Sequence, residues 1–220
     1  MRRVRLPWLF WLGLVLYVVI TILVAAGVLN GLDRAVQRAC THHRQDTIAA
    51  AARHFTNVFS GATDVACLGV GAGALAWWRR RPAIFVFAAL AAGGMSGIVG
   101  VTKAAVTRPL PSAVYTTHQG GVYPSGHTAA FLVCFGTLAL LATTRHRRLR
   151  TPLLVTAVAG AVLVAAAMVY DSFHWLTDCI GSFALGTALL ALVQAGVSRR
   201  RASPSPRAET PPSDRTARRR

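Results

Sequence analysis

The sequence YPSGH, at Tyr123–His127, lies directly before an apolar run that extends to about Thr143. A second short polar piece, HWLTD at His174–Asp178, begins the last apolar run of the chain. A third begins at Lys103, where another apolar run ends, and contains Arg108. Ionisable residues at the ends of membrane segments are costly unless they are paired or functional. We therefore expect the three pieces to lie on one side of a membrane and to form a single site.

The composition indicates an integral membrane protein. Of the 220 residues, 54% are hydrophobic and only 14% are charged, whereas soluble domains carry about 25% charged residues. The net charge of +17 therefore does not by itself indicate nucleic-acid binding. The side of the bilayer on which the basic residues lie has to be considered first. The four cysteines, Cys40, Cys67, Cys134 and Cys179, lack metal-site spacing, so we treat them as small apolar residues.

The apolar runs predict an all-α, polytopic membrane protein built as a six-span helical bundle. The first run resembles a signal peptide superficially, but it is long enough for a helix of about 20 residues across a bilayer, so we interpret it as an uncleaved anchor. Between the first two spans, apolar residues recur at helical spacing from about 30 to 56, which predicts one or two short amphipathic helices at the interface. The predicted spans are 6–29, 57–78, 83–102, 126–143, 152–170 and 175–197.

The distribution of basic residues predicts the orientation. Six spans place both termini on one side, together with the loops at 79–81 and 145–150. That side holds 18 of the 24 lysines and arginines, so by the positive-inside rule it is cytoplasmic and the three polar pieces are extracytoplasmic, in the cell membrane. We interpret the arginine clusters as topology anchors rather than lipid or nucleic-acid sites. Residues 1–198 are expected to form the membrane domain, and residues 199–220, rich in Pro, Ser and Arg, a disordered basic cytoplasmic tail.

His174 and Asp178 are four residues apart, which on a helix places both on one face. A carboxylate there can accept a hydrogen bond from Nδ1–H of His174, leave the lone pair on Nε2, and stabilise the imidazolium that forms after attack. The pair is a candidate nucleophile with its orienting acid. A structural role for a His/Asp pair of this spacing is about equally common.

Ser125, Gly126 and His127 follow a proline and precede a predicted helix, so Ser125 is a candidate N-cap. The backbone N–H groups of Gly126 and His127 would then lie at the positive end of the helix dipole, where anions bind. Gly126 allows close backbone approach, and His127 is a candidate general acid. With His174 and Asp178 on the same side, a functional site is favoured over ordinary capping.

These motifs resemble those of the type 2 phosphatidic acid phosphatase family. The pattern of that family is Lys-x6-Arg-Pro, then Pro-Ser-Gly-His, then Ser-Arg-x5-His-x3-Asp, on a six-span bundle with an extracytoplasmic site. Residues 124–127 match the second motif in full, 174–178 match the end of the third, and Lys103 starts the first. The resemblance covers roughly residues 58–197.

The resemblance implies a role for each matching residue. It implies that His174 attacks phosphorus and forms a phosphohistidine, and that Asp178 orients it. His127 would be the general acid. Lys103 and Ser125 would hold phosphate oxygens. It implies neither a metal ion nor another cofactor.

Two arginines of the family pattern are not at their places. Counting from Lys103, the arginine of the first motif falls on Leu110, while Arg108 stands two residues earlier. Many family members carry an additional arginine there, so Arg108 is either that residue or the phosphate clamp at a shortened spacing. In the third motif Met168 occupies the arginine position. Neither Leu nor Met supplies the bidentate fork that binds phosphate oxygens, and the loss of one cation is worth several kcal/mol in phosphoryl transfer, to order of magnitude.

Three interpretations of this loss are open. The first is that the enzyme is weak or inactive. The second is that other cations bind the phosphate, with Lys103 and Arg108 better placed to do so than His118. The third is that the substrate carries its charge in another arrangement. The presence of His174, Asp178 and His127 together favours an active enzyme, because ionisable groups at a membrane surface are costly.

We therefore expect a membrane phosphatase, a monoester or diphosphate hydrolase, that removes a terminal phosphate from a lipid. Candidate substrates are a polyprenyl phosphate or diphosphate, phosphatidic acid and phosphatidylglycerol phosphate. The alternatives are a phosphotransferase on the same site, and a binder or transporter of a lipid phosphate, which the lost arginines favour. The expected partners are the lipid phosphate and the bilayer, with no nucleic acid. The sequence does not decide the oligomeric state.

Two further acidic residues have open roles. Asp171, one turn before His174, is either a partner of Arg108 or Lys103 or a solvated loop residue. Asp64 lies inside the second predicted span and either reaches the site or hydrogen-bonds a neighbouring helix.

Overall fold

The protein is described by a computed structural model over residues 7–111 and 121–202. Within these ranges the secondary structure is helical, with no strand. In chain order the helices are α1 (Trp8–Ala25), α2 (Asn30–His42), α3 (Asp46–Val58), α4 (Gly61–Arg79), α5 (Ala83–Ala105), α6 (Gly126–Ala142), the short 3₁₀ helix η2 (Arg147–Leu149), α7 (Arg150–Tyr170) and α8 (Leu176–Ala202).

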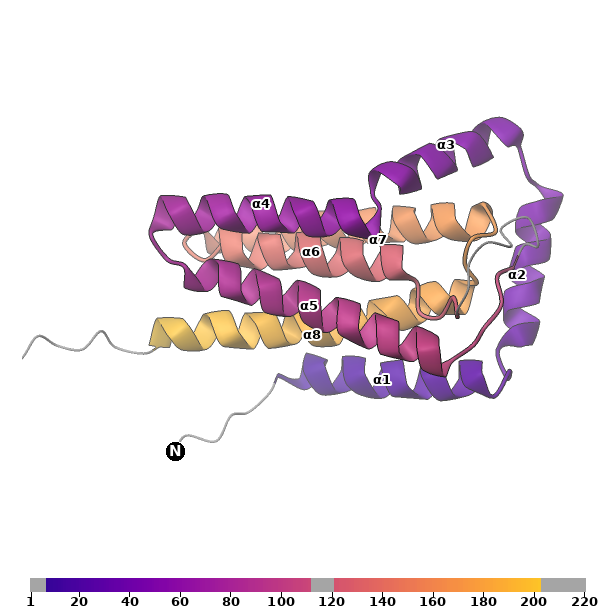
Figure 1. The fold of residues 1–220 in the computed structure, drawn as a ribbon, viewed down its shortest axis with the longest axis horizontal. Coiled ribbons are helices and arrows are strands. Elements are labelled where there is room, and N and C mark those ends of the chain that lie inside the picture. Colours follow the sequence, from indigo (N-terminus) through magenta and orange to yellow (C-terminus); the bar gives the residue numbers. More distant parts are fainter. Residues whose placement is uncertain (1–6, 112–120, 203–220) are drawn as a thin grey trace, which may run out of the picture.

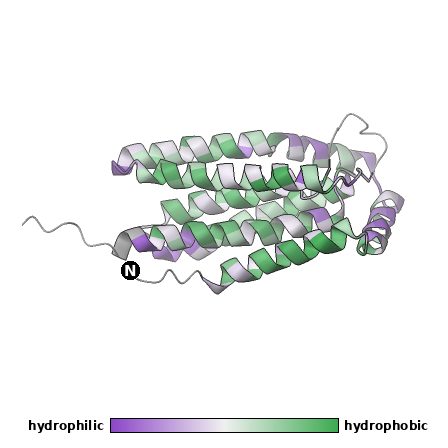
Figure 2. Ribbon diagram, turned by 60° about the horizontal axis from the view of Figure 1, so that its bottom comes forward, coloured by the Kyte–Doolittle hydropathy of each residue, from purple (hydrophilic) through white to green (hydrophobic). Residues whose placement is uncertain are grey.

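The long helices run alongside one another, and the two ends of this bundle differ (Figure 1). Helix α2 lies across one end, which we call the site end. The opposite end holds the end of α8 and the turns that contain Arg79–Arg81 and Arg145–Arg150, whereas α1 begins part-way along the bundle. We call it the arginine end. Figure 2 shows hydrophilic residues gathered towards both ends and hydrophobic residues between them, as expected for helices that cross a bilayer.

The all-α prediction is confirmed, with four to five candidate membrane spans. By length and hydropathy, α1, α5, α7 with η2, and α8 each qualify among the described helices. Helices α3 and α4 pass the same test only together, as a pair bent by 42°, and α6 is an apolar helix of 17 residues. The count of six crossings stays a prediction, and so does the face of the membrane on which each end lies.

Helix α1 ends at Ala25 instead of about residue 29, and α4 begins at Gly61 instead of about residue 57. Two other helices extend beyond their predicted ends. Lys103 was expected in a loop, but α5 continues to Ala105, so Lys103 lies in its last turn. Residues 199–202 were expected in the tail, but α8 continues to Ala202. Both extensions have the same cause: hydropathy marks where a span leaves the apolar layer, whereas Lys, Arg and Ala are good helix formers that prolong a helix beyond it. The rest of the predicted tail lies outside the described residues.

Helix α6 is the central helix and positions the site. It packs against α4, α5, α7 and α8, and its side chains are buried on nearly every face from Thr128 to Leu141. Helix α1 approaches α8 closely, since a Cβ on Gly13 would lie 2.7 Å from the backbone nitrogen of Ala188. This packing holds the start of α6, with the sequence YPSGH, in the middle of the site end.

The two helices between the first predicted spans are confirmed as α2 and α3. Helix α2 contacts α7 and α8, and α3 contacts α7. Asp171, just after α7, joins them to the bundle: its Oδ1 accepts bonds from Arg44 (2.8 Å) and Arg53 (2.7 Å). Asp171 is buried, so it is not a solvated loop residue. Its two partners, Arg44 in the turn between α2 and α3 and Arg53 in α3, were not among its predicted partners.

Candidate active site

His174, in the buried turn between α7 and α8, and Asp178, in the first turn of α8, form the predicted pair. Nδ1 of His174 lies 3.2 Å from Oδ2 of Asp178. The two were expected on one helix, but α8 begins at Leu176, so His174 lies in the turn before it. An ionised carboxylate only accepts hydrogen bonds, so this contact assigns the proton to Nδ1 and the lone pair to Nε2.

The carboxylate of Asp178 is held on both oxygens. Oδ2 also accepts the backbone N–H of Trp175 at 3.0 Å. Oδ1 accepts a bond from Nη1 of Arg108 at 2.6 Å. Asp178 is fully buried, where its oxygens need hydrogen-bond donors from the protein. The position of Asp178 relative to His174 is therefore fixed by three separate donors.

Arg108 is engaged by other protein groups through both of its terminal nitrogens. Besides Asp178, Nη1 donates to Oγ1 of Thr177 at 2.8 Å. Nη2 forms an ion pair with Asp33 and lies 3.4 Å from Oδ1 of Asn30. The guanidinium lies over the ring of Trp175, with its central carbon 5.3 Å from the ring centroid. In this arrangement the fork that would grip a phosphate is occupied by two carboxylates.

Asp33 is a site residue that sequence reasoning did not single out. It lies in a segment predicted to form an amphipathic helix at the membrane interface, yet it is only 1% exposed. Its Oδ1 accepts the backbone N–H of Thr177 at 3.0 Å, and its Oδ2 accepts the hydroxyl of Thr177 at 2.6 Å. Asp33 thus reaches from α2 to the first turn of α8, where an anion is stabilised by unpaired N–H groups and by the helix dipole. The only feature of the sequence that could have pointed to Asp33 is that acidic residues are rare, since the chain has only seven of them.

The start of α6 is joined directly to this turn. Ser125 is the N-cap of α6, as predicted, and its Oγ accepts the N–H of Thr128 at 3.4 Å. The backbone N–H of Ser125 donates to the carbonyl of Asp178 at 3.2 Å. The hydroxyl of Ser182 lies 2.8 Å from the carbonyl of Ser125 and 2.9 Å from that of Asp178. The second and third sequence motifs therefore meet, although about fifty residues separate them.

Lys103 completes the cluster from α5. Its Nζ lies 4.0 Å from the position that a Cβ would take on Gly126, and Lys103 interacts with the charge of Asp178. Gly121 packs against the end of α5 so closely that a Cβ would collide with the carbonyl oxygens of Val106 and Lys103. Only glycine allows this approach, which brings Lys103 to the helix start that follows. His127, the second residue of α6, is half-buried.

Tyr123 anchors the loop before α6. It is fully buried and its hydroxyl lies 2.9 Å from Oγ1 of Thr21. Since the Thr21 hydroxyl donates to the carbonyl of Tyr17, Tyr123 is the donor. Burial raises the pKa of the Tyr123 phenol well above its usual range. Tyr123 therefore stays protonated, which suits an anchor and not a proton-transfer group.

Apolar packing replaces the missing arginine of the third motif. Met168 is 3% exposed and belongs to a cluster with Phe131, Leu132 and Val164, against which Phe55 and other partly buried aromatic residues pack. No ion pair involves this position among the described residues. Position 168 is thus part of the core and is not a vacant place in a phosphate cradle.

The remaining candidates are not brought into the cluster. Asp64 lies in the first turn of α4, fully buried, and neither of its oxygens has a hydrogen-bond partner among the described residues. His118 falls outside the described residues. Over 7–111 and 121–202, no three His, Cys, Asp or Glu side chains converge as metal ligands would. A cavity of about 450 Å³ opens beside the cluster and is lined by Asp33, Arg108 and Trp175 among others.

Comparison with known proteins identifies the family. The model of the PAP2 superfamily matches residues 81–202, which is more than half of the chain and includes all three motifs. The fold is similar to the crystal structure described as the first transmembrane PAP2 type phosphatidylglycerolphosphate phosphatase from Bacillus subtilis. The TM-score is 0.75 at 21% sequence identity, over 86% of this chain and 97% of that chain. No curated protein matches the sequence. On these grounds the chain belongs to the PAP2 superfamily.

Proposed function

We propose that this protein is a membrane phosphatase that removes a terminal phosphate from a lipid through a phosphohistidine on His174. The observation that carries the proposal is the buried contact between Nδ1 of His174 and the triply held carboxylate of Asp178. It leaves Nε2 as the basic nitrogen, the form a histidine needs in order to attack phosphorus. After attack the ring is an imidazolium, which the adjacent carboxylate stabilises.

The phosphate is bound, in this proposal, by Lys103 and the start of α6. The Lys103 ammonium lies next to Gly126, and the N-terminus of a helix is a ready anion site because its N–H groups and dipole favour negative charge. Ser125 caps the helix through its oxygen, so its hydroxyl hydrogen can donate to a phosphate oxygen. His127 protonates the leaving oxygen and then activates the attacking water.

Arg108 has a positioning role in this scheme. Its terminal nitrogens bond to Asp33, Asp178, Thr177 and Asn30, so it orients the acid that orients the nucleophile. The phosphate then meets fewer cations than the family pattern supplies, and we expect slow turnover.

Phosphatidic acid and phosphatidylglycerol phosphate are the first substrates to test, because the family and the Bacillus subtilis neighbour take their names from them. The arginine distribution supports an extracytoplasmic site.

The test is phosphate release from a panel of lipid phosphates by the purified protein in detergent with a metal chelator. Wild type should release phosphate from at least one of them. His174→Ala should abolish release, and His146→Ala, an exposed histidine at the arginine end, should not. Equal rates for wild type and His174→Ala would refute the proposal. Label on an acceptor lipid would instead identify a phosphotransferase, and tight binding without turnover in wild type and His174→Ala alike a binding protein.

A further inference from the structure

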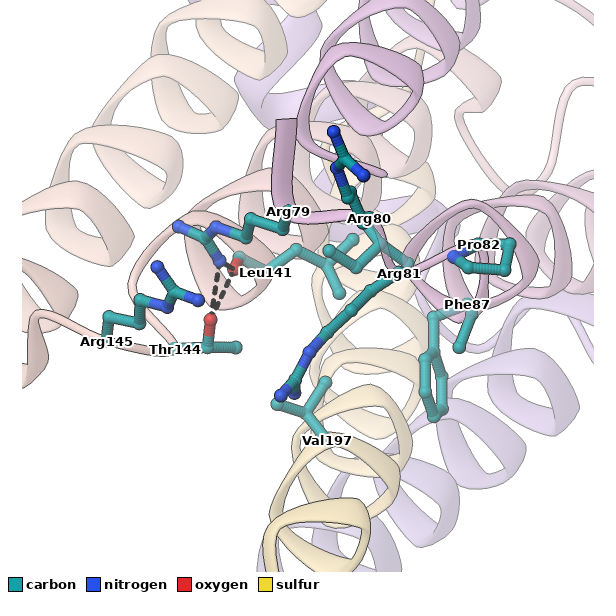
Figure 3. A pocket seen from close by; sticks show the side chains of 11 residues that line it. Arg79, Arg80, Arg81, Pro82, Phe87, Leu141, Thr144, Arg145 and Val197 are labelled. Carbon is teal, nitrogen blue, oxygen red and sulfur yellow. Dashed lines mark hydrogen bonds between the residues drawn. The ribbon is translucent and has the colours of Figure 1, made fainter. Parts of the chain in front are cut away.

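We propose that a cavity at the arginine end binds the headgroup of an anionic phospholipid from the adjoining leaflet. The cavity has a volume of about 640 Å³ and lies between the α4–α5 turn, the end of α6 and the end of α8 (Figure 3). It is at the opposite end of the bundle from His174 and does not depend on the phosphatase proposal.

The charge around this cavity is entirely positive over the described residues. Arg79, Arg80, Arg81 and Arg145 line it, and no acidic residue does. The five acidic residues at described positions all belong to elements of the site end: Asp33, Asp46, Asp64, Asp171 and Asp178. The counter-ion must therefore come from outside the described chain, and a phospholipid phosphate is the anion that a bilayer supplies at this depth.

One of the arginines is held in place by the protein. Nη1 of Arg79 donates to the carbonyl of Leu141 (2.9 Å) and to Oγ1 of Thr144 (2.6 Å), and Nη2 donates to the carbonyl of Ala142 (2.7 Å). These are carbonyls of the last turn of α6, which a cation stabilises. A guanidinium fixed in this way gives the cavity a positively charged side that is already ordered before a ligand binds. An arginine that only anchors the topology would not need to be held in place.

Two other arginines are available for the ligand. In Figure 3, Arg145 lies beside Arg79 and Thr144, while Arg81 extends from the α4–α5 turn towards Val197. The side chains of Arg81 and Arg145 have no hydrogen bond or ion pair with any described residue, and both are exposed. Arginine forks bind phosphate oxygens bidentately, so these two can close on a headgroup from two sides.

Apart from Thr144, the rest of the lining is apolar, which favours a lipid over a soluble anion. Ile84, Phe87 and Val197 contribute side chains. At the same end, Trp77 and Trp78 are 88% and 76% exposed, and exposed tryptophans mark the membrane–water interface. A phospholipid places its phosphate at this level and its acyl chains alongside the apolar wall, whereas free phosphate would leave that wall unused.

The experiment compares lipid retention by variants of equal charge. Full-length protein would be purified from nanodiscs of phosphatidylcholine with 20% phosphatidylglycerol, and bound lipid would be counted by native mass spectrometry. Wild type should retain one phosphatidylglycerol. Arg81→Gln/Arg145→Gln should retain it at least tenfold less often. Arg148→Gln/Arg199→Gln, which removes two exposed arginines of the same end outside the cavity, should behave as wild type.

Two further arms keep the result decisive. Ala83→Trp fills the cavity without touching an arginine and should also lose the lipid, even if the double variant folds poorly. Millimolar inorganic phosphate should not displace the lipid. The proposal is overturned if both double variants lose lipid equally, if Ala83→Trp retains it, or if phosphate displaces it, which would indicate a site for a small soluble anion.

Discussion

Asp33, on α2, forms a buried ion pair with Arg108, the arginine that follows α5. Through its other contacts Asp33 also receives the backbone and hydroxyl hydrogens of Thr177 at the start of α8. Since the same guanidinium bonds Asp178, an acidic residue outside all three motifs is connected to the proposed nucleophile through two intermediates. The amphipathic helix α2 is thus a structural part of the site.

Asp33→Asn should lower both stability and turnover. The amide keeps the size of the side chain but removes the charge opposite Arg108, and loss of a hydrogen bond to a buried charged group costs about 1–3 kcal/mol. Arg108 then pulls Asp178 out of line, so kcat should fall about tenfold while KM changes little. Thermal unfolding and steady-state kinetics measure both. Asp46→Asn, on the exposed face of α3, is the control, and an equal melting temperature for the two variants would contradict the assignment.

Asp178→Asn should reduce kcat far more, by roughly 10⁴-fold, as removal of the orienting carboxylate does in hydrolytic triads. An amide presents an N–H to Nδ1 of His174 and so favours the tautomer whose Nε2 carries the proton. Asp171→Asn is the matched comparison, because Asp171 is equally buried but bonds Arg44 and Arg53. If the two substitutions lower kcat to the same extent, Asp178 acts through folding and not through His174.

Met168→Arg should not restore a phosphate clamp. The side chain would enter an apolar cluster with Phe131 and Val164, where an unpaired charge costs several kcal/mol. We expect a lower melting temperature and lower activity, whereas Met168→Leu should cost less than about 1.5 kcal/mol. A clear gain in phosphate release by Met168→Arg would show that position 168 still faces the phosphate.

Gly181→Ala should disable the site from a distance. A Cβ on Gly181 would collide with the hydroxyl of Tyr123 and approach its ring carbon Cζ to 2.8 Å. Because Tyr123 is fully buried, it can yield only by shifting the loop that carries Ser125. Activity should fall at least tenfold as measured by phosphate release. Gly97→Ala meets nothing within 4 Å and should be neutral, so equal activities of the two variants would count against the packing described for Tyr123.

Much of the fold and the core of the site were predictable because they depend on local patterns. Apolar runs located the long helices, and Ser125 was recognised as an N-cap because capping involves neighbours in sequence. The contact between His174 and Asp178 could likewise be predicted, because the two residues are only four apart in the sequence.

The parts that escaped prediction depend on tertiary contacts. Nothing local distinguishes Asp33 from the other charges of α2, since its burial comes from packing against α7 and α8. Arg108 was predicted to bind phosphate, and only the meeting of α2 with α8 shows that Asp33 and Asp178 occupy it. The apolar surroundings of Met168 likewise come from three other helices.

The most direct test of the account is to trap the intermediate. A lipid phosphate labelled with ³²P would be mixed with the protein, quenched in alkali within milliseconds, and the label located by peptide mapping. The account predicts acid-labile, alkali-stable label on the peptide that contains His174, absent from His174→Ala and present in His146→Ala. Phosphate release without label on that peptide, or label on another residue, would contradict it.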